Sequence, residues 1–460
     1  MRKRTIVILS SIAGLVVLLF CGMAYYQCTR FNATITINDT KVGGLTAEQA
    51  LTKLKTSVSK NTIFMGQKVL YDGKDTKMGF TNQDLDAVKM LLKKQWTLFP
   101  SSKTINYSLK PSETNQTHIQ TMAKKIEEKL QAMNKQLKAP KNAEVYLVNG
   151  KIVVSKAKEG TQYDLSALLK EYREQAFNSE VHLKPVYLQP LKATSSTIKL
   201  EKAKLEALQE QTVDYKLQDK VYPFKGRDVI QNASLSNDMK VLFDSRGIKK
   251  KLSELNRTLS TLNKNYTFKT HSGTMIAVKG ATYGWAINVD AEAKRIKQAF
   301  EKEQPSILAY NIYGAGWNIN GVGYHTPSNH GIGDTYVEVS IEQQRIWVYK
   351  NGQLKVTTHV VTGTHAYNED TPKGVWYIEY KQSPSILTGS EVGNPNYSVK
   401  VNYWAPFTLS GCGFHDASWR NNWSSQAYLN NGSGGCINTP PSVMKAVYDN
   451  LTQYEPVVIY

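Results

Sequence analysis

The longest run of apolar residues lies close to the N-terminus. Residues 5–27 carry no charged side chain and consist largely of Ile, Leu, Val and aromatic residues. About 20 apolar residues, at ~1.5 Å rise per residue, are enough to cross the hydrocarbon core of a bilayer. The pattern therefore predicts a single transmembrane helix over residues 5–27.

Basic residues at one end of this helix predict its orientation. Arg2, Lys3 and Arg4 precede it, and positive charge beside a span stays on the cytoplasmic side. Residues 1–4 are then a cytoplasmic tail, and the rest of the chain lies outside the cell membrane. A cleaved signal peptide is the alternative, although Phe20–Ala24 is a poor small-residue cleavage site.

Further along, a helical pattern leads into two alternating runs and then a second helix. The runs are Ala143–Val148 and Lys151–Val154, and Asn149-Gly150 between them is a hairpin signal. The second helix is expected to begin near Asp164. Together with a short strand pair over residues 33–42 and a helix capped by Thr46, these elements predict an α+β module over residues 28–195.

The same order of elements returns between residues 248 and 300. A helical run is followed by strands at Tyr266–Lys269 and Met275–Val278, and then by a helix with Asp290 as its expected N-cap. This repeat predicts a second α+β module over residues 196–309. Because two copies are too few for a solenoid, each module should bury its own core.

From residue 335 onward the pattern changes again. Residues 310–334 are rich in Gly and Asn, which predicts a linker or an irregular loop. Short alternating runs then predict a mainly β domain over residues 335–460. Its strands are expected at 335–341, 345–350, 352–358, 374–380 and 456–460, with one helix from Ser442 to Leu451.

The charge of the chain is uneven. The 460 residues carry a formal charge of +19. Residues 335–460 hold 8 Lys and Arg against 9 Asp and Glu, a balance of −1, which leaves +20 for residues 1–334. Outside a membrane such a basic surface attracts anionic lipids and wall polymers; scattered lysines that only keep the protein soluble are the alternative. No zinc-finger spacing, Walker loop or aromatic-basic RNA-binding signature is present, so nucleic acid is not an expected partner.

The composition also limits the chemistry. No group of His, Cys and carboxylates has the spacing of metal ligands, and no Gly-rich phosphate loop occurs, so we expect neither a metal nor a cofactor. Four cysteines are too few for a disulfide scaffold. A disulfide between Cys412 and Cys436 stays open as an alternative to a free thiol in the last domain.

A histidine and a cysteine of the last domain have the surroundings of a nucleophilic site. His415 stands in Gly413–Ala417, and Cys436 stands in Ser433–Asn438. A thiol attacks as the thiolate and therefore needs a base or a cation beside it. Glycines before the cysteine let backbone N–H groups approach a developing oxyanion. The pair predicts a cysteine nucleophile with a histidine base.

Residues 335–460 resemble the catalytic domain of the L,D-transpeptidases, the YkuD-type cysteine acyltransferases of bacterial cell walls. The resemblance rests on four segments, and the α+β modules are similar, more loosely, to the peptidoglycan-binding domains that precede this catalytic domain. The segments are Thr371-Pro372-Lys373-Gly374, Asn402-Tyr403-Trp404-Ala405-Pro406-Phe407, Gly413-Phe414-His415-Asp416 and Ser433-Gly434-Gly435-Cys436-Ile437-Asn438.

The resemblance implies a role for each of these residues. Cys436 would be the nucleophile that attacks a peptidoglycan stem tetrapeptide, expels its D-alanine and becomes acylated. His415 would be the general acid and base. The main chain of Asp416 would orient that histidine, and the N–H groups of Gly435 and Cys436 would bind the oxyanion. Acceptor attack would then give a 3→3 cross-link. The resemblance also implies substrate-cleft and loop positions at Tyr403, Trp404, Trp419, Ser433 and Asn438.

One position departs from the family's pattern. The family usually has His directly after the Ser of the last motif, where this chain has Gly434. Two alternatives to a cross-linking enzyme therefore stay open. The same site could serve an L,D-carboxypeptidase, with water as acceptor, or the chain could be a wall-binding protein without catalysis.

Overall fold

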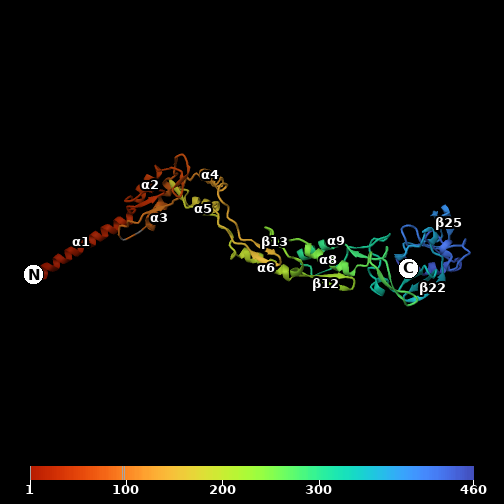
Figure 1. Ribbon diagram of the computed structural model, residues 1–460. Helices are drawn as coiled ribbons and strands as arrows, with labels where there is room; N and C mark the ends of the chain where they lie inside the picture. The colour runs from red at the N-terminus through yellow and green to blue at the C-terminus, as the bar shows by residue number, and fades with distance from the viewer. Residues whose placement is uncertain (1, 96, 98) are drawn as a thin grey trace. The chain divides into compact units, whose positions relative to one another are not determined.

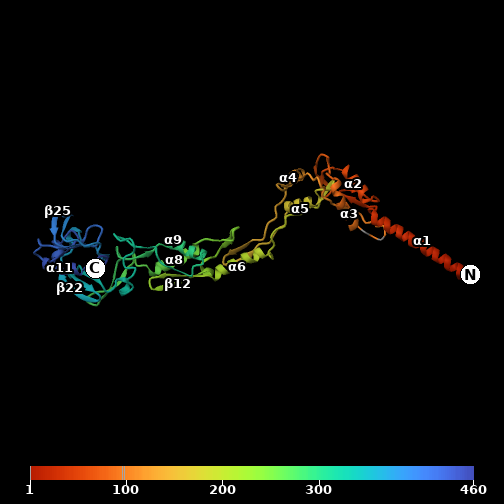
Figure 2. The same ribbon diagram turned by 180° about the vertical axis from the view of Figure 1, so that it is seen from behind.

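The computed structural model of the chain describes residues 2–95, 97 and 99–460, with side chains from residue 8 onward. Met1, part of the predicted tail 1–4, lies outside the described residues. The chain divides into two compact units: Met1–Glu144 with Val154–Lys199, and Val145–Val153 with Leu200–Tyr460. Figures 1 and 2 show their elements from opposite sides.

The first unit begins with α1 (Arg2–Thr29), drawn in red in Figure 1. Within it, Ile8–Thr29 is a 22-residue segment whose most apolar 18-residue window has a mean hydropathy of 2.2 and no buried residue. Among the described residues it is the one helix long and apolar enough to cross a membrane. Arg2, Lys3 and Arg4 form the first residues of the same helix, and their cytoplasmic location stays a prediction.

Two small α+β cores form the rest of the first unit. The sheet β2-β1-β7 packs with α2 and α3, and the sheet β10-β4-β5 packs with α4 and α5. Strands β3 and β6 form a separate pair. The bounds are β1 Ile35–Ile37, β2 Thr40–Lys41, α2 Ala47–Lys55, β3 Val58–Ser59, β4 Thr62–Met65, β5 Lys68–Asp72, β6 Thr76–Lys77, α3 Leu85–Lys94, β7 Ile105–Tyr107, α4 Gln116–Asn134, α5 Leu165–Gln175 and β10 Glu180–Leu183, with a 3₁₀ turn at Asn82–Asp84.

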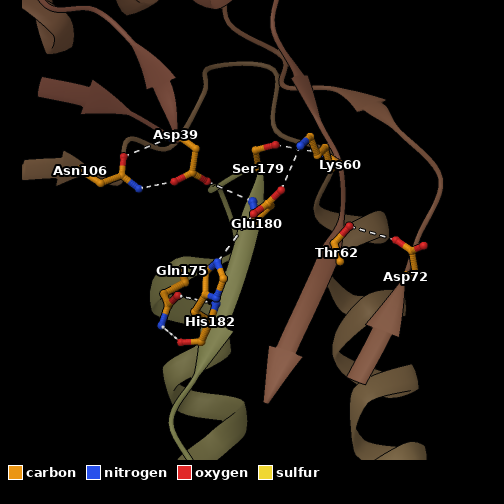
Figure 3. Close-up of polar contacts among 9 residues, drawn as sticks. All are labelled: Asp39, Lys60, Thr62, Asp72, Asn106, Gln175, Ser179, Glu180 and His182. Carbon is orange, nitrogen blue, oxygen red and sulfur yellow. Dashed lines mark hydrogen bonds and ion pairs between the residues drawn. The ribbon is translucent and has the colours of Figure 1, made fainter. Parts of the chain in front are cut away.

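Polar contacts join these two cores, as Figure 3 shows. Asp39, in the turn between β1 and β2, accepts from Nδ2 of Asn106 on β7 (2.6 Å) and from the N–H of Glu180 on β10 (3.0 Å). Nζ of Lys60 lies 3.0 Å from Oε1 of Glu180. Because the groups are largely exposed, this network orients the two sheets more than it stabilises them.

The second unit begins with a helix-rich module. The sheet β12-β11-β18 is covered by helices that bury Leu205, Ile248 and Phe300, and α8 and α9 lie side by side (green in Figure 1). The bounds are α6 Ser196–Glu210, β11 Thr212–Leu217, β12 Lys220–Lys225, α7 Gly226–Val229, β13 Ala233–Leu235, β14 Val241–Phe243, α8 Arg246–Leu259, β15 Tyr266–Lys269, β16 Met275–Val278, β17 Ala286–Ile287, α9 Val289–Glu301, β18 Ser306–Leu308 and β19 Ile312–Tyr313.

The hairpin of β8 (Val145–Val148) and β9 (Lys151–Val154) forms where the sequence predicts it, but it belongs to a different core. It extends the sheet β14-β13-β8-β9, with Ala233 paired to Leu147. The predicted module 28–195 is therefore not continuous in space. The alternating pattern specifies a strand with one buried face, and it does not specify which element covers that face.

Helix starts follow the capping side chains. Thr46 caps α2 in a capping box with Gln49, and Asp164 caps α5 by accepting from the N–H of Ala167. The expected cap at Asp290 is wrong, because α9 begins two residues earlier. There Asn288 accepts from the N–H of Ala291, and Asp290 lies inside the first turn.

The C-terminal domain is built on the five-stranded sheet β22-β21-β20-β29-β23. Helix α11, labelled in Figure 2, and the small sheet β26-β27-β28 cover one face of it, around Ile346, Phe414 and Met444. The bounds are β20 Tyr336–Ser340, β21 Arg345–Lys350, β22 Gln353–His359, β23 Gly374–Tyr377, β24 Ser385–Glu391, β25 Asn394–Val401, β26 Trp404–Pro406, β27 Gly413–Asp416, α10 Ala427–Asn430, β28 Ile437–Thr439, α11 Pro441–Asn450 and β29 Pro456–Ile459, with 3₁₀ turns at Asn329–Gly331 and His365–Tyr367.

The opposite face of this sheet is buried by the preceding module. Val375 and Val458 pack in one cluster with Tyr266 and Phe268 of the β15–β16 hairpin. Ile332, from the stretch predicted as a linker, is fully buried in the same cluster. Residues 310–334 are thus a packed connector, and the C-terminal domain shares a core with the module before it.

Candidate active site

His415 and Cys436 come from neighbouring parallel strands. Strand β27 pairs with β28 in the register Phe414 to Ile437 and His415 to Asn438, and Cys436 directly precedes β28. Side chains alternate between the faces of a strand. Phe414 and Ile437 therefore point into the core, whereas His415 and Asn438 share the other face.

The ring of His415 is held on several sides. Its Nδ1 lies 3.0 Å from the main-chain oxygen of Asp416. With its amide oriented to satisfy both neighbours, Asn438 donates to Nε2 of His415 (3.1 Å) and accepts from Nε and Nη2 of Arg420 (both 3.0 Å). Trp419 stacks on the imidazole, with ring centroids 5.7 Å apart. Burial lowers the pKa of His415, so the ring is neutral at neutral pH.

The carboxylate of Asp416 serves the neighbouring loop and not the histidine. Its Oδ1 accepts from the N–H groups of Asn402 (2.8 Å) and Tyr403 (2.9 Å), and its Oδ2 accepts from Nδ2 of Asn402 (2.9 Å). Asp416 thus fixes the loop that enters β26, while its main chain holds His415.

The thiol of Cys436 is half-buried and forms a hydrogen bond with the main chain. Its Sγ donates to the main-chain oxygen of Gly411 at 3.6 Å. Burial, with smaller contributions from the nearby Cys412 and Glu391, raises the pKa of Cys436 to about 12, although the N–H of Gly413 acts to lower it. The resting side chain is therefore a protonated thiol. Cys412 and Cys436 are both free thiols in this structure.

The loop before Cys436 is closed by hydrogen bonds. Ser433 Oγ donates to the main-chain oxygen of Cys436 (2.6 Å) and accepts from the N–H of Gly435 (3.2 Å). Thr371 Oγ1 donates to the oxygen of Gly435 (2.8 Å). Gly435 has φ +111°, and a Cβ there would come within 2.9 Å of Sγ of Cys412. The expected oxyanion donor, the N–H of Gly435, is thus occupied by Ser433 in this state.

A cavity of about 620 Å³ leads to Cys436. It is lined by one face of the β24–β25 hairpin together with Tyr380, Gln382, Trp404, Gly411 and Cys436. Of the five expected substrate positions, Trp404 lines this cavity. Trp419 lies against His415, and Ser433 and Asn438 brace the site. Tyr403 instead packs at a tilt against Tyr448 at the core, with ring centroids 5.1 Å apart.

Two parts of the site were not anticipated from the sequence. Arg420 donates through Nη1 to the oxygen of Asn431 (2.6 Å) and through Nη2 to the oxygen of Gly432 (2.7 Å), besides its contact with Asn438. It is the one charged residue between Asp416 and Lys445, and this isolation could have marked it as a functional residue in the sequence. The β24–β25 hairpin offers a weaker signal, because most of its side chains are exposed and few are apolar.

No group of three His, Cys, Asp or Glu side chains that could hold a metal ion occurs in the described part of the chain. The charged and nucleophilic groups around Cys436 are those of the protein itself. What the arrangement can do chemically is acyl transfer, with a thiol nucleophile and a neutral imidazole close by.

Comparisons with known proteins agree with this chemistry. Residues 334–459 match the family described as "L,D-transpeptidase catalytic domain", and residues 197–309 match the family described as "Putative peptidoglycan binding domain". No curated protein sequence matches the chain. The second family covers only the later of the two expected modules, so the same function for the first module stays a prediction.

Solved structures that are similar to this chain include L,D-transpeptidases of Enterococcus faecium. A cysteine-to-serine variant of that enzyme is 27% identical, with 56% of this chain and 99% of that chain covered and a TM-score of 0.46. The isolated catalytic domain, solved by NMR free and acylated by ertapenem, is 38% identical, with 28% of this chain and 97% of that chain covered and TM-scores of 0.25 and 0.26. On the family matches, this chain belongs to the YkuD-type L,D-transpeptidases.

Proposed function

We propose that this chain is a membrane-anchored enzyme that forms 3→3 cross-links in peptidoglycan through an acyl-enzyme on Cys436. The observation that carries the proposal is the placement of His415 on β27 and of Cys436 directly before the paired strand β28, with a cavity that reaches Cys436. The neutral, oriented imidazole can accept a proton, and the cavity can admit an extended peptide to the thiol.

In the first half-reaction, Sγ of Cys436 attacks the carbonyl carbon of the third residue of a tetrapeptide stem. The new C–S bond replaces the C–N bond to the terminal D-alanine, and the thiol proton reaches the leaving amine through His415. In the second, an acceptor amine attacks the thioester carbon. The C–S bond breaks, an amide forms, and a proton from the amine returns to Cys436 through His415.

Three local rearrangements are part of this proposal. The amide of Asn438 releases Nε2 of His415, because that nitrogen must accept the thiol proton. The thiol of Cys436 rotates from the oxygen of Gly411 toward the imidazole, since catalytic hydrogen bonds often tighten only once substrate is bound. The N–H of Gly435 exchanges Ser433 Oγ for the oxyanion. Trp404 forms the wall along the donor stem, and Trp419 shields the other side of the ring from water. Ser433 and Asn438 act by holding these groups, and Tyr403 acts only through the loop fixed by Asp416.

The anchor follows from the apolar segment Ile8–Thr29 and the three basic residues before it. It places the catalytic domain at the outer side of the cell membrane, next to the wall. The measurement is the N-terminal sequence of the protein recovered from the membrane fraction. Recovery of a chain that begins after residue 24 would show a cleaved signal peptide and would overturn the anchor.

The activity is tested by mass spectrometry of the products that the full chain in detergent makes from disaccharide-tetrapeptide, beside a Cys436→Ala control. Cysteine-dependent dimers that lack one D-alanine support the proposal. Cysteine-dependent tripeptides alone would make the protein an L,D-carboxypeptidase. No product from a folded, reduced protein would favour a wall-binding protein without catalysis. A carbapenem should in addition add to Cys436, which intact mass detects.

A further inference from the structure

The tip of the β24–β25 hairpin brings a carboxylate over the loop of the nucleophile. Glu391 ends β24 and pairs with Asn394 across the tip. The tip is fastened by the N–H of Val392, which donates to Oε1 of Glu369 at 2.7 Å. A Cβ added to Gly434 would lie 3.1 Å from Cβ of Glu391 and 3.5 Å from its Oε2. Glu391 thus occupies the room that a side chain at position 434 would need.

This carboxylate has no hydrogen bond or ion pair from its side chain to any residue of the described chain. Its charge nevertheless acts on the reacting groups. It contributes to the raised pKa values of Cys436 and Tyr397, and it opposes the burial that lowers the pKa of Arg420. Glu391 thus lies against the loop that carries Cys436, and its negative charge disfavours the thiolate.

The negative charge of Glu391 opposes thiolate formation in the first half-reaction. Its presence is explained if it assists the second half-reaction. The thioester is attacked by an amine, which is cationic at neutral pH before it loses a proton. Lys400, which lines the cavity on the same hairpin, pairs with Ile386. At about 3.4 Å per residue it lies roughly 17 Å along the strands from Glu391. The hairpin thus carries a positive group toward the cavity and a negative group at the tip beside Gly434.

We propose that Glu391 binds the ammonium group of the acceptor stem and delivers the amine to the acyl-enzyme on Cys436. This inference rests on the proposed function and names its acceptor class as a primary amine. The bound ammonium releases one proton to water. The amine then attacks the thioester carbon, the C–S bond breaks, and the second proton passes through His415 to the sulfur of Cys436. Water as acceptor gains nothing from this carboxylate.

The test separates the two half-reactions of the full chain in detergent. Glu391→Gln removes the charge and keeps the shape, and Glu342→Gln, at an exposed turn outside the site, is the matched control. Dimer formation at limiting acceptor should fall by about tenfold in E391Q, because a charge-assisted contact is lost. Acylation of Cys436 by a carbapenem should be unchanged or faster, and Glu391→Asp should recover part of the dimer yield.

A loss in transfer without a loss in acylation supports the inference, since a hairpin that was merely misplaced would slow both. Equal losses in both half-reactions, or dimer formation unchanged in E391Q, would overturn it while the proposed function stands. A wild-type enzyme that yields only tripeptides would overturn both, because the acceptor would then be water. The E342Q control should behave as wild type in each assay.

Discussion

Nδ1 of His415 lies 3.0 Å from the main-chain oxygen of Asp416. A carbonyl oxygen can only accept, so Nδ1 carries the proton and Nε2 of the neutral ring carries the lone pair. Asn438 donates to that Nε2, and Arg420 in turn donates to Asn438. The base is thereby set in one tautomer by groups from both ends of the site.

Removal of the amide beside the base should slow the enzyme without unfolding it. We expect Asn438→Ala to lower kcat/KM by about three- to tenfold, because one hydrogen bond that orients His415 is lost. Steady-state kinetics of dimer formation measures this. Asn421→Ala, at an exposed asparagine in the same connection, should leave kcat/KM unchanged. Equal effects of the two substitutions would contradict the role given to Asn438.

Arg420 should not be replaceable by lysine. Its guanidinium binds Asn431, Gly432 and Asn438 at once, which a single ammonium group cannot reproduce. We expect Arg420→Lys to destabilise the catalytic domain by roughly 1–3 kcal/mol and to lower kcat. Thermal unfolding and dimer formation are the two measurements. A wild-type melting temperature together with wild-type kcat would show that the charge alone suffices.

The resting thiol should react slowly and with a steep pH dependence. Because the pKa of Cys436 is raised to about 12, its thiolate fraction rises about tenfold per pH unit from pH 7 to 9. Alkylation by iodoacetamide, followed at the Cys436 peptide by mass spectrometry, should follow that slope. Site-resolved detection is needed because Cys21 and Cys28 are exposed. A rate that levels off near pH 7 would instead reveal a thiolate paired with a protonated His415.

Gly435 should be costly to replace, for two separable reasons. Its φ of +111° is strained for any other residue, and a new Cβ would meet Sγ of Cys412 at 2.9 Å. We expect Gly435→Ala to destabilise the domain by about 1–3 kcal/mol. The same change in a Cys412→Ala background should cost less, because only the backbone strain remains. Equal costs in the two backgrounds, measured by denaturant unfolding, would exclude the contact with Cys412.

The sequence predicted the elements of the catalytic domain closely where one face of a strand is apolar. The expected strand at 345–350 and the expected helix from Ser442 agree with β21 and α11 to within one residue. The β24–β25 hairpin was missed because its only alternating run, Tyr397–Val401, is short, and only its base at Ser385 and Val401 is buried. Glu391, which lies at its tip, could not be connected with Cys436 from sequence distance alone.

For the site too, the sequence predicted which residues react but not how the surrounding groups are arranged. Residue type and spacing predicted His415 and Cys436, since few side chains can serve as base and nucleophile. They did not predict that Ser433 occupies the N–H of Gly435, or that Tyr403 turns toward Tyr448 and the core. Those outcomes depend on which face of a loop the fold buries, and a local pattern of residues does not specify it.

The shared core predicts that a residue outside the catalytic domain stabilises it. Phe268, on β15, is fully buried and packs edge-on against Tyr336 of β20, with ring centroids 5.4 Å apart. Phe268→Ala should cost roughly 3–5 kcal/mol through the cavity it leaves, and should lower the melting temperature of the catalytic domain by on the order of 10 °C. Met275→Ala, on the exposed side of the same hairpin, should change it little. An unchanged melting temperature of the catalytic domain in the Phe268 variant would mean that the two domains unfold independently. The expected lower melting temperature means that the module before the catalytic domain is part of the scaffold that holds β20 and β29 in place.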